Sequence, residues 1–219
     1  MCFSATASFS VGAAIAATGI VAVAQEKPPS HRMLALVPLM FAAQQLAEGF
    51  VWLTIDPDGR ARNLVAVSVF LAFALVIWPL WVPVSLLMAE KNPGRRRLLT
   101  VFCCAGFGLA VYTTQMLLGG RPGAHLAGHR LAYDYTRAGP ALASALSLPA
   151  YAIPSVLPFF VSTISRAKAI GVVLAAALVA TYLLERRAFA SVWCFFAAII
   201  SAIIVISIRQ DQRLSVTVA

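Results

Sequence analysis

The segment Met33–Thr54, MLALVPLMFAAQQLAEGFVWLT, contains the feature that best defines this chain. It is long enough to cross a bilayer as one helix, which takes about 20 residues. Glu48 is the one formally charged residue within it. A charge inside a span costs from a few to more than ~10 kcal/mol, so such a residue usually marks a functional site. The segment therefore predicts a membrane helix that carries a functional carboxylate.

The composition of the whole chain is that of a membrane protein. Of the 219 residues, 61% are hydrophobic and 11% are charged, and the mean hydropathy is +0.86. Soluble domains carry about 25% charged and 45–50% apolar residues. In lipid, only helices and closed barrels satisfy every backbone group. Because the apolar runs are continuous rather than alternating, we predict an all-α membrane protein.

Seven apolar segments have about the length of a membrane span. The third contains Trp78-Pro79 and Pro83, which predict a kink near its end because proline removes a helical hydrogen bond. The sequence predicts a single transmembrane domain over residues 1–219. It would be a bundle of seven helices at about residues 4–24, 33–54, 64–89, 98–118, 142–164, 169–184 and 190–208.

The basic residues of the connections predict how this bundle is oriented. Ten Lys and Arg residues lie in the odd-numbered connections and the C-terminal tail, against seven in the even-numbered ones. The cluster Arg95-Arg96-Arg97 dominates the first group. The positive-inside rule then places the N-terminus outside and the C-terminus in the cytoplasm of a bacterial inner-membrane protein. The long connection at residues 119–141 would be external.

This arrangement gathers reactive side chains at the external end of the bundle. Cys2 begins the first span, Glu48 lies about 9 Å below the outer end of the second, His129 lies in the external connection, and Cys194 begins the seventh span. These four residues would suit zinc, or copper if the thiolates dominate. Glu48 and Cys2 are the candidate catalytic residues. The expected supporting residues are Gln44, Gln45, Trp52, Gln115, Tyr133 and Trp193.

Other interpretations of these residues stay open. Gln44, Glu48 and Trp52 are spaced i, i+4 and i+8, so they line one helix stripe. Glu48 would then be a buried carboxylate, hydrogen-bonded to Gln and Trp, that fixes helix packing. On an oxidising side of the membrane, Cys2 and Cys194 would form a structural disulfide or a redox pair. As a further alternative, both cysteines are small apolar fillers.

The two histidines of the long connection also allow two interpretations. His125 and His129 are spaced i, i+4, so they would bind one metal ion if the segment were helical. The stretch from His129 to Tyr135 alternates instead, as an extended strand does. In that case we expect His125 and His129 to share a face with Leu131 and Tyr133.

The leading functional hypothesis is a metal-dependent hydrolase that acts on a lipid or another apolar small molecule. The alternatives are a non-catalytic sensor, transporter or complex subunit with a Cys2–Cys194 disulfide, and a thiol redox protein. The three lysines (Lys27, Lys91 and Lys168) lie at or beyond the membrane edges, which argues against retinal. No predicted span contains a histidine, which argues against haem held between helices. Membrane lipids, and not nucleic acid, are the expected partners.

Several short strings of the chain resemble a known group of proteins. The opening Met1-Cys2-Phe3-Ser4-Ala5-Thr6-Ala7-Ser8-Phe9 is similar to the start of an uncharacterised bacterial family of integral membrane proteins. Other similar strings are Leu36–Leu39, Gln44–Gly49, His129–Tyr133 and Ser191–Cys194. The resemblance covers the whole chain and implies a multi-pass membrane protein. It brings no established activity with it.

Overall fold

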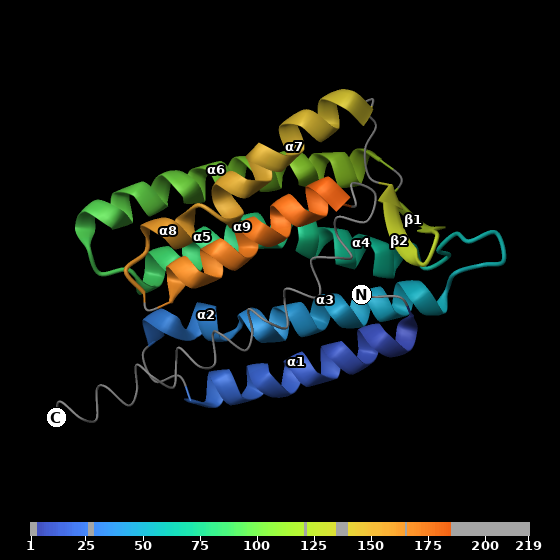
Figure 1. Ribbon diagram of the computed structural model, residues 1–219, viewed down its shortest axis with the longest axis horizontal. Helices are drawn as coiled ribbons and strands as arrows, with labels where there is room; N and C mark the ends of the chain where they lie inside the picture. The colour runs from blue at the N-terminus through green and yellow to red at the C-terminus, as the bar shows by residue number, and fades with distance from the viewer. Residues whose placement is uncertain (1–3, 26–28, 121, 135–139, 165, 185–219) are drawn as a thin grey trace.

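The computed structural model describes residues 4–25, 29–120, 122–134, 140–164 and 166–184. Its long helices lie side by side along one axis, and a β-hairpin lies at one end of them (Figure 1). The elements are α1 (Ala5–Gln25), the 3₁₀ turn η1 (Pro29–His31), α2 (Arg32–Ala35), α3 (Val37–Leu53), α4 (Leu64–Ala72), the π-helical turn η2 (Phe73–Ile77), α5 (Trp78–Ala89), α6 (Pro93–Gly119), β1 (Gly123–Ala127), β2 (Arg130–Asp134), α7 (Pro140–Ser155), α8 (Pro158–Val161) and α9 (Ala167–Leu184).

Four helical segments are long and apolar enough to cross a membrane: residues 5–24, 29–53, 64–89 and 93–119. They match the first four predicted spans closely. The fifth predicted span, 142–164, is divided between α7 and α8, which end at Ser155 and Val161. The sixth, 169–184, lies within α9. The seventh, 190–208, lies outside the described residues, so the number seven stays a prediction.

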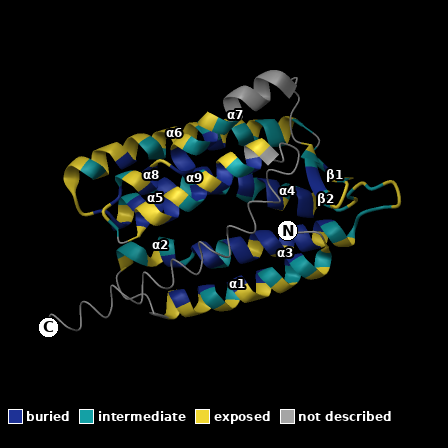
Figure 2. Cartoon of the chain, viewed as in Figure 1, coloured by how far each residue is buried: buried dark blue, intermediate teal, exposed yellow. Residues whose placement is uncertain are grey.

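Helices α1 and α3 pack closely because glycines line their contact. A Cβ added at Gly19 would lie 2.7 Å from the Leu39 side chain, and one added at Gly49 would lie 2.7 Å from the ring of Phe9. Small residues of this kind let helix backbones approach each other in a membrane, where packing contributes much of the association energy. The two helices therefore form one rigid pair, and α3 is the more buried of the two (Figure 2).

The prolines of the third segment remove helical donors to two backbone carbonyl groups, and α6 contacts both of these groups. In an α-helix, Pro79 has no N–H to donate to the Leu75 carbonyl, and Pro83 has none for the Pro79 carbonyl. The Thr113 hydroxyl of α6 lies 3.0 Å from the Leu75 oxygen and 2.9 Å from the Leu109 carbonyl of its own helix, so the two carbonyls share its one proton. Gly106 lies against the Pro79 carbonyl so closely that a Cβ there would overlap the oxygen. The segment also contains the π-helical turn η2, before Pro79, which the sequence analysis did not predict. The kink near the end of the span stays a prediction.

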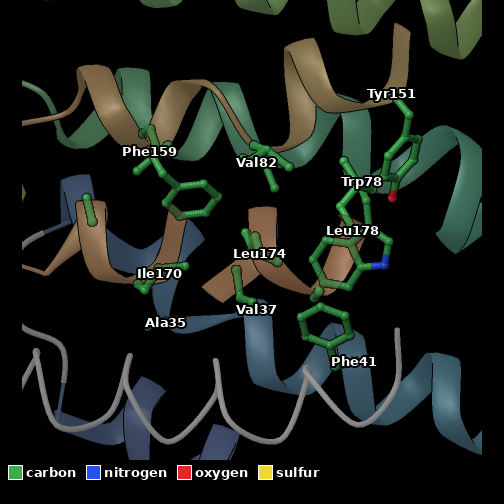
Figure 3. Packing of buried hydrophobic residues seen from close by; sticks show 14 of the residues in the cluster. Ala35, Val37, Phe41, Trp78, Val82, Tyr151, Phe159, Ile170, Leu174 and Leu178 are labelled. Atoms are coloured by element: carbon green, nitrogen blue, oxygen red, sulfur yellow. The ribbon is translucent and has the colours of Figure 1, made fainter. Parts of the chain in front are cut away.

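Apolar residues of α3, α5 and α9 together fill the middle of the bundle. Phe41 of α3 stacks on Trp78 of α5, with ring centroids 3.9 Å apart and planes 26° apart. Figure 3 shows Leu178 of α9 beside this pair and Leu174 beside Val37. These residues belong to one buried apolar cluster, so α9 is part of the core and not an outer helix alone.

The connection predicted as a loop contains two strands, so the fold is not purely helical. β1 and β2 are antiparallel, and Ala127 pairs with Arg130 across the two-residue turn Gly128-His129. Gly128 has φ +64°, the positive φ that a tight hairpin turn requires at one of its central residues. The strand prediction for residues 130–134 is confirmed. The hairpin packs on residues 59–61, where the Leu126 amide donates to the Gly59 carbonyl at 2.7 Å.

The hairpin register corrects one expectation about His125. Leu131 pairs with Leu126 and Tyr133 pairs with Ala124, so these four residues share one face. His125 pairs with Ala132 and lies on the other face, where its Nδ1 is 2.8 Å from the Asp134 carboxylate. The expectation that His125 shares the face of Leu131 and Tyr133 is wrong, because the tight turn changes the alternation between the two strands. We call the end of the bundle that carries this hairpin the hairpin end.

Glu90 joins two connections at the opposite end of the bundle, which we call the basic end. Its carboxylate is 2% exposed and accepts hydrogen bonds from the amides of Lys91, Asn92 and Thr163 and from the Thr163 hydroxyl, at 2.7–3.0 Å. Burial raises the pKa of Glu90, and it is the largest single influence. Together the four hydrogen bonds outweigh it and hold the pKa below its ordinary value. The ionised carboxylate therefore stabilises the fold.

We predict that Glu90→Gln lowers the free energy of unfolding by about 1–3 kcal/mol at pH 7, because an amide nitrogen would replace the oxygen that accepts from the Thr163 amide. Since the folded pKa is lowered, the contribution of Glu90 is present above its unfolded pKa and is lost as pH falls through the folded pKa. Unfolding in detergent at pH 7 and at pH 3 measures both effects. The difference between variant and wild type should shrink at pH 3, and the exposed Asp58→Asn is the control.

The contact between α5 and α6 gives a second prediction about stability. Gly106→Ala forces a Cβ into the Pro79 carbonyl, a backbone group that cannot rotate away, and should cost about 1–3 kcal/mol or more. Gly108→Ala on the same helix meets no atom within 4 Å, and alanine is the better helix former, so it should be neutral or stabilising. Thermal unfolding of both variants tests this. Equal midpoints would contradict the close approach of α6 to α5.

Candidate functional site

The described charges separate into two groups at the ends of the bundle, and Glu48 belongs to neither. The basic end carries seven cationic residues and one acidic residue: Arg32, Lys91, Arg95, Arg96, Arg97, Arg166, Lys168 and Glu90. The hairpin end carries three of each sign: Arg60, Arg62, Arg130, Asp56, Asp58 and Asp134. Among the described Asp, Glu, Lys and Arg residues, Glu48 alone lies inside the bundle away from both ends.

Glu48 lies on α3, within two turns of its end at Leu53, and its side chain is 0% exposed. The Gln45 amide nitrogen, one turn earlier, donates to its Oε2 at 3.2 Å. α1 encloses this side of α3, because a Cβ at Gly12 would lie 3.2 Å from the Gln45 Cβ. A carboxyl group is therefore held between packed helices, with a neutral amide as its described partner.

Two more polar groups lie at the same level of α3. Gln44 and Gln45 are each 1% exposed. The Trp78 indole N–H donates to the Gln44 Oε1 at 2.7 Å, which joins α3 to α5 in a buried hydrogen bond. We call Gln44, Gln45, Glu48 and the Trp78 indole the Glu48 layer. This layer crosses the apolar core on its hairpin side, next to the Phe41–Trp78 stack.

The π-helical turn η2 directly precedes Trp78 of the Glu48 layer in the chain. Ala74 of η2, Phe70 of α4 and Ala47, the residue before Glu48, belong to one small apolar cluster. Short π-helical turns occur frequently at functional sites, because the additional residue changes the direction of the surrounding side chains. The turn and the carboxylate are thus neighbours in space although 25 or more residues separate them in the chain.

Tyr133 connects the hairpin to the same cluster. Its ring stacks on Phe70 with centroids 4.4 Å apart and planes 8° apart. It is packed against the cluster that also contains Ala47 and Ala74. Of the supporting residues that the sequence proposed, Tyr133 is the one that links the β-hairpin to the neighbourhood of Glu48.

The remaining proposed residues lie elsewhere or outside the described part of the chain. His129 is exposed in the tight hairpin turn, and Gln115 is exposed on α6. Trp52 is half-buried one turn after Glu48, and its Nε1 has no hydrogen-bond partner among the residues described. Cys2, Trp193 and Cys194 fall outside the described residues. Their use as metal ligands, as a disulfide or as supporting groups is therefore still a prediction.

Within the described residues, no three His, Cys, Asp or Glu side chains come together as a metal site. Because two of the four proposed ligands are not among those residues, the proposed set itself stays untested. The described cysteines Cys103 and Cys104 are free thiols on α6.

Two groups near the site were not recognised from the sequence. Trp78 was noted for its proline neighbour and not as the partner of Gln44. Ser8 of α1 is 0% exposed, and its hydroxyl has no partner among the described residues. Ser8 precedes Gly12 by four residues, so it lies on the face of α1 that contacts Gln45, one turn nearer the hairpin end. In the sequence, Ser8 could have been recognised because it lies four positions before Gly12 and therefore on the same helix face.

Chemically, the Glu48 layer offers a carboxyl group and amide groups in an enclosed apolar setting. Such a carboxyl group can bind a proton or a cation, and it can transfer a proton to a molecule that reaches it. A fully enclosed carboxylate without a bound proton or cation would carry a large desolvation cost. The arrangement therefore favours a site in which the ionised Glu48 carboxylate is accompanied by a bound cation, and the neutral carboxyl group by its own proton.

Comparisons with known proteins give a family but no activity. No curated protein and no solved structure matches the chain. The family model that matches is described as "Family of unknown function (DUF6629)", and it covers residues 1–218. This agrees with the resemblance of the short strings to an uncharacterised family. The chain belongs to DUF6629, a family of unknown function.

Proposed function

We propose that the chain is a multi-pass protein of the bacterial inner membrane, with the hairpin end outside and the basic end in the cytoplasm. The support is the difference between the two ends: seven described cations against one acid at the basic end, and three against three at the hairpin end. Lys and Arg accumulate on the cytoplasmic side of membrane proteins. Seven spans would place the N-terminus outside and the C-terminus inside.

We further propose that the Glu48 layer binds a cation that enters from the hairpin side. The observation that carries this proposal is the complete burial of the Glu48 carboxyl group between apolar helices, with the Gln45 amide at 3.2 Å. Carboxylates buried in a span are costly and usually serve a function. Cys2 and Cys194 would add thiolate ligands and His129 an imidazole, which makes zinc or copper the proposed ion.

In the catalytic form of this proposal the protein is a metal-dependent hydrolase for a lipid or another apolar small molecule. The metal would supply an activated water. Glu48 would accept a proton and then return it to the leaving group. Gln45 would hold the carboxyl group in place, and Tyr133 would connect the site to the external hairpin.

A non-catalytic carrier or sensor is the second candidate, and the π-helical turn favours it. Many transporters bind their substrates where a helix is interrupted near the middle of the membrane. Here η2, Pro79 and Pro83 interrupt the third segment, and Ala74 of η2 packs beside Ala47. In this case the Cys2–Cys194 pair would be a structural disulfide, and the ion at Glu48 would be transported or sensed.

Elemental analysis of the full-length protein tests the metal site. The protein is purified in detergent without chelator and without a polyhistidine tag. We expect about one zinc or copper ion per chain, lost in Cys2→Ser and in Glu48→Gln. Cys104→Ser, which changes an exposed thiol on α6, should keep the ion. Wild-type protein without metal would exclude the hydrolase and leave the carrier or sensor.

Substitutions of Gln44 and Glu48 distinguish a packing role of Glu48 from a functional one. Gln44→Leu leaves the buried Trp78 N–H without its acceptor and should lower the free energy of unfolding by about 1–3 kcal/mol. Glu48→Gln keeps an acceptor for Gln45 and should change stability by less than about 1 kcal/mol while ion binding is lost. Unfolding in detergent measures both. If Glu48→Gln instead destabilised the fold as much as Gln44→Leu, Glu48 would be a packing residue.

A further inference from the structure

We propose that the basic end of the bundle is a binding surface for the phosphate groups of anionic lipids. Three of its exposed cations form what we call the basic rim: Lys91, Arg97 and Lys168. They come from the connection between α5 and α6, the start of α6, and the start of α9, which lie at the same end of the bundle in Figure 1. This inference goes beyond the proposed function and does not depend on the Glu48 layer.

The rim is held in place by hydrogen bonds between the two connections at this end. Glu90 of the first connection accepts from the Thr163 amide and hydroxyl of the second, both at 2.7 Å. Arg95 donates to the Val161 carbonyl, and Arg96 donates to the Leu87 and Glu90 carbonyls at 2.7 and 2.9 Å. Because the backbone is fixed before a ligand arrives, little of the binding energy is lost in ordering it.

No acidic side chain described at this end neutralises the rim. Glu90 is the one described acid there, and both of its oxygens already accept hydrogen bonds inside the fold. The hairpin end differs, because its cations are matched by acids and one pair is close: Arg62 Nε lies 3.5 Å from the Asp56 carboxylate. Among the described residues, only those of the basic end therefore carry an excess of positive charge that attracts anions.

The surface next to the rim indicates that the anion belongs to a lipid. Exposed apolar residues begin within a few positions of the cations: Met88 before Lys91, Leu98 after Arg97, and Val172 after Lys168. A lipid with an acidic headgroup fits this order, with its phosphate at the rim and its chains along the apolar helices. Each Lys or Arg near a membrane surface strengthens binding to anionic lipids by about fivefold.

The test compares lipid binding to two variants of the full-length protein by native mass spectrometry from neutral detergent. Lys91→Gln/Arg97→Gln/Lys168→Gln removes three rim charges. The Lys91 change keeps the amide that Glu90 binds. Arg60→Gln/Arg62→Gln/Arg130→Gln removes three charges from the hairpin end and is the matched control. Phosphatidylglycerol, phosphatidylcholine and inorganic phosphate are added separately, and both variants must elute as folded, monodisperse protein.

Wild-type protein and the control should bind phosphatidylglycerol more tightly than phosphatidylcholine. The rim variant should lose affinity for phosphatidylglycerol by on the order of 100-fold, with little change for phosphatidylcholine. Equal phosphatidylglycerol binding by the rim variant, or an equal loss in the control, would overturn the proposal. Binding of inorganic phosphate with no preference between the two lipids would also overturn it, because the ligand would then be a soluble anion.

Discussion

A polar group enclosed by apolar helices must find its partner within the protein, and this constraint organises the whole bundle. Each unmet backbone or side-chain group there costs several kcal/mol. Thr113 therefore contacts the carbonyl that Pro79 leaves without a donor, and Trp78 donates to Gln44. At the basic end, the buried Glu90 carboxylate likewise accepts four hydrogen bonds from groups of two connections. The helices are thus placed by polar contacts at a few points and by apolar packing between them.

These contacts place the irregular part of the third segment beside the buried carboxylate. Thr113 and Gly106 hold α6 against the proline-interrupted region, and Ala74 of η2 shares an apolar cluster with Ala47, just before Glu48. Trp78 follows η2 directly and reaches Gln44, so any change in the π-helical turn would act on the Glu48 layer through one hydrogen bond. The proposed ion at Glu48 would therefore be coupled to the geometry of the third segment.

The sequence predicted the features that depend on local pattern. The first four predicted spans are long apolar helices, Glu48 is enclosed, and residues 130–134 form a strand. Features that depend on distant residues were missed. The partner of Gln44 is 34 positions away, and the face of His125 depends on a turn that shifts the alternation.

The central claim is that Glu48 binds a cation and is not simply a packing residue. Isothermal titration of zinc into metal-free, full-length protein in detergent, with Glu48→Gln beside the wild type, tests it most directly. We predict one site per wild-type chain and at least ~10-fold weaker binding in the variant, since a ligating charge is lost. Equal zinc binding by two equally folded proteins would contradict the claim and leave Glu48 as a structural residue of the bundle.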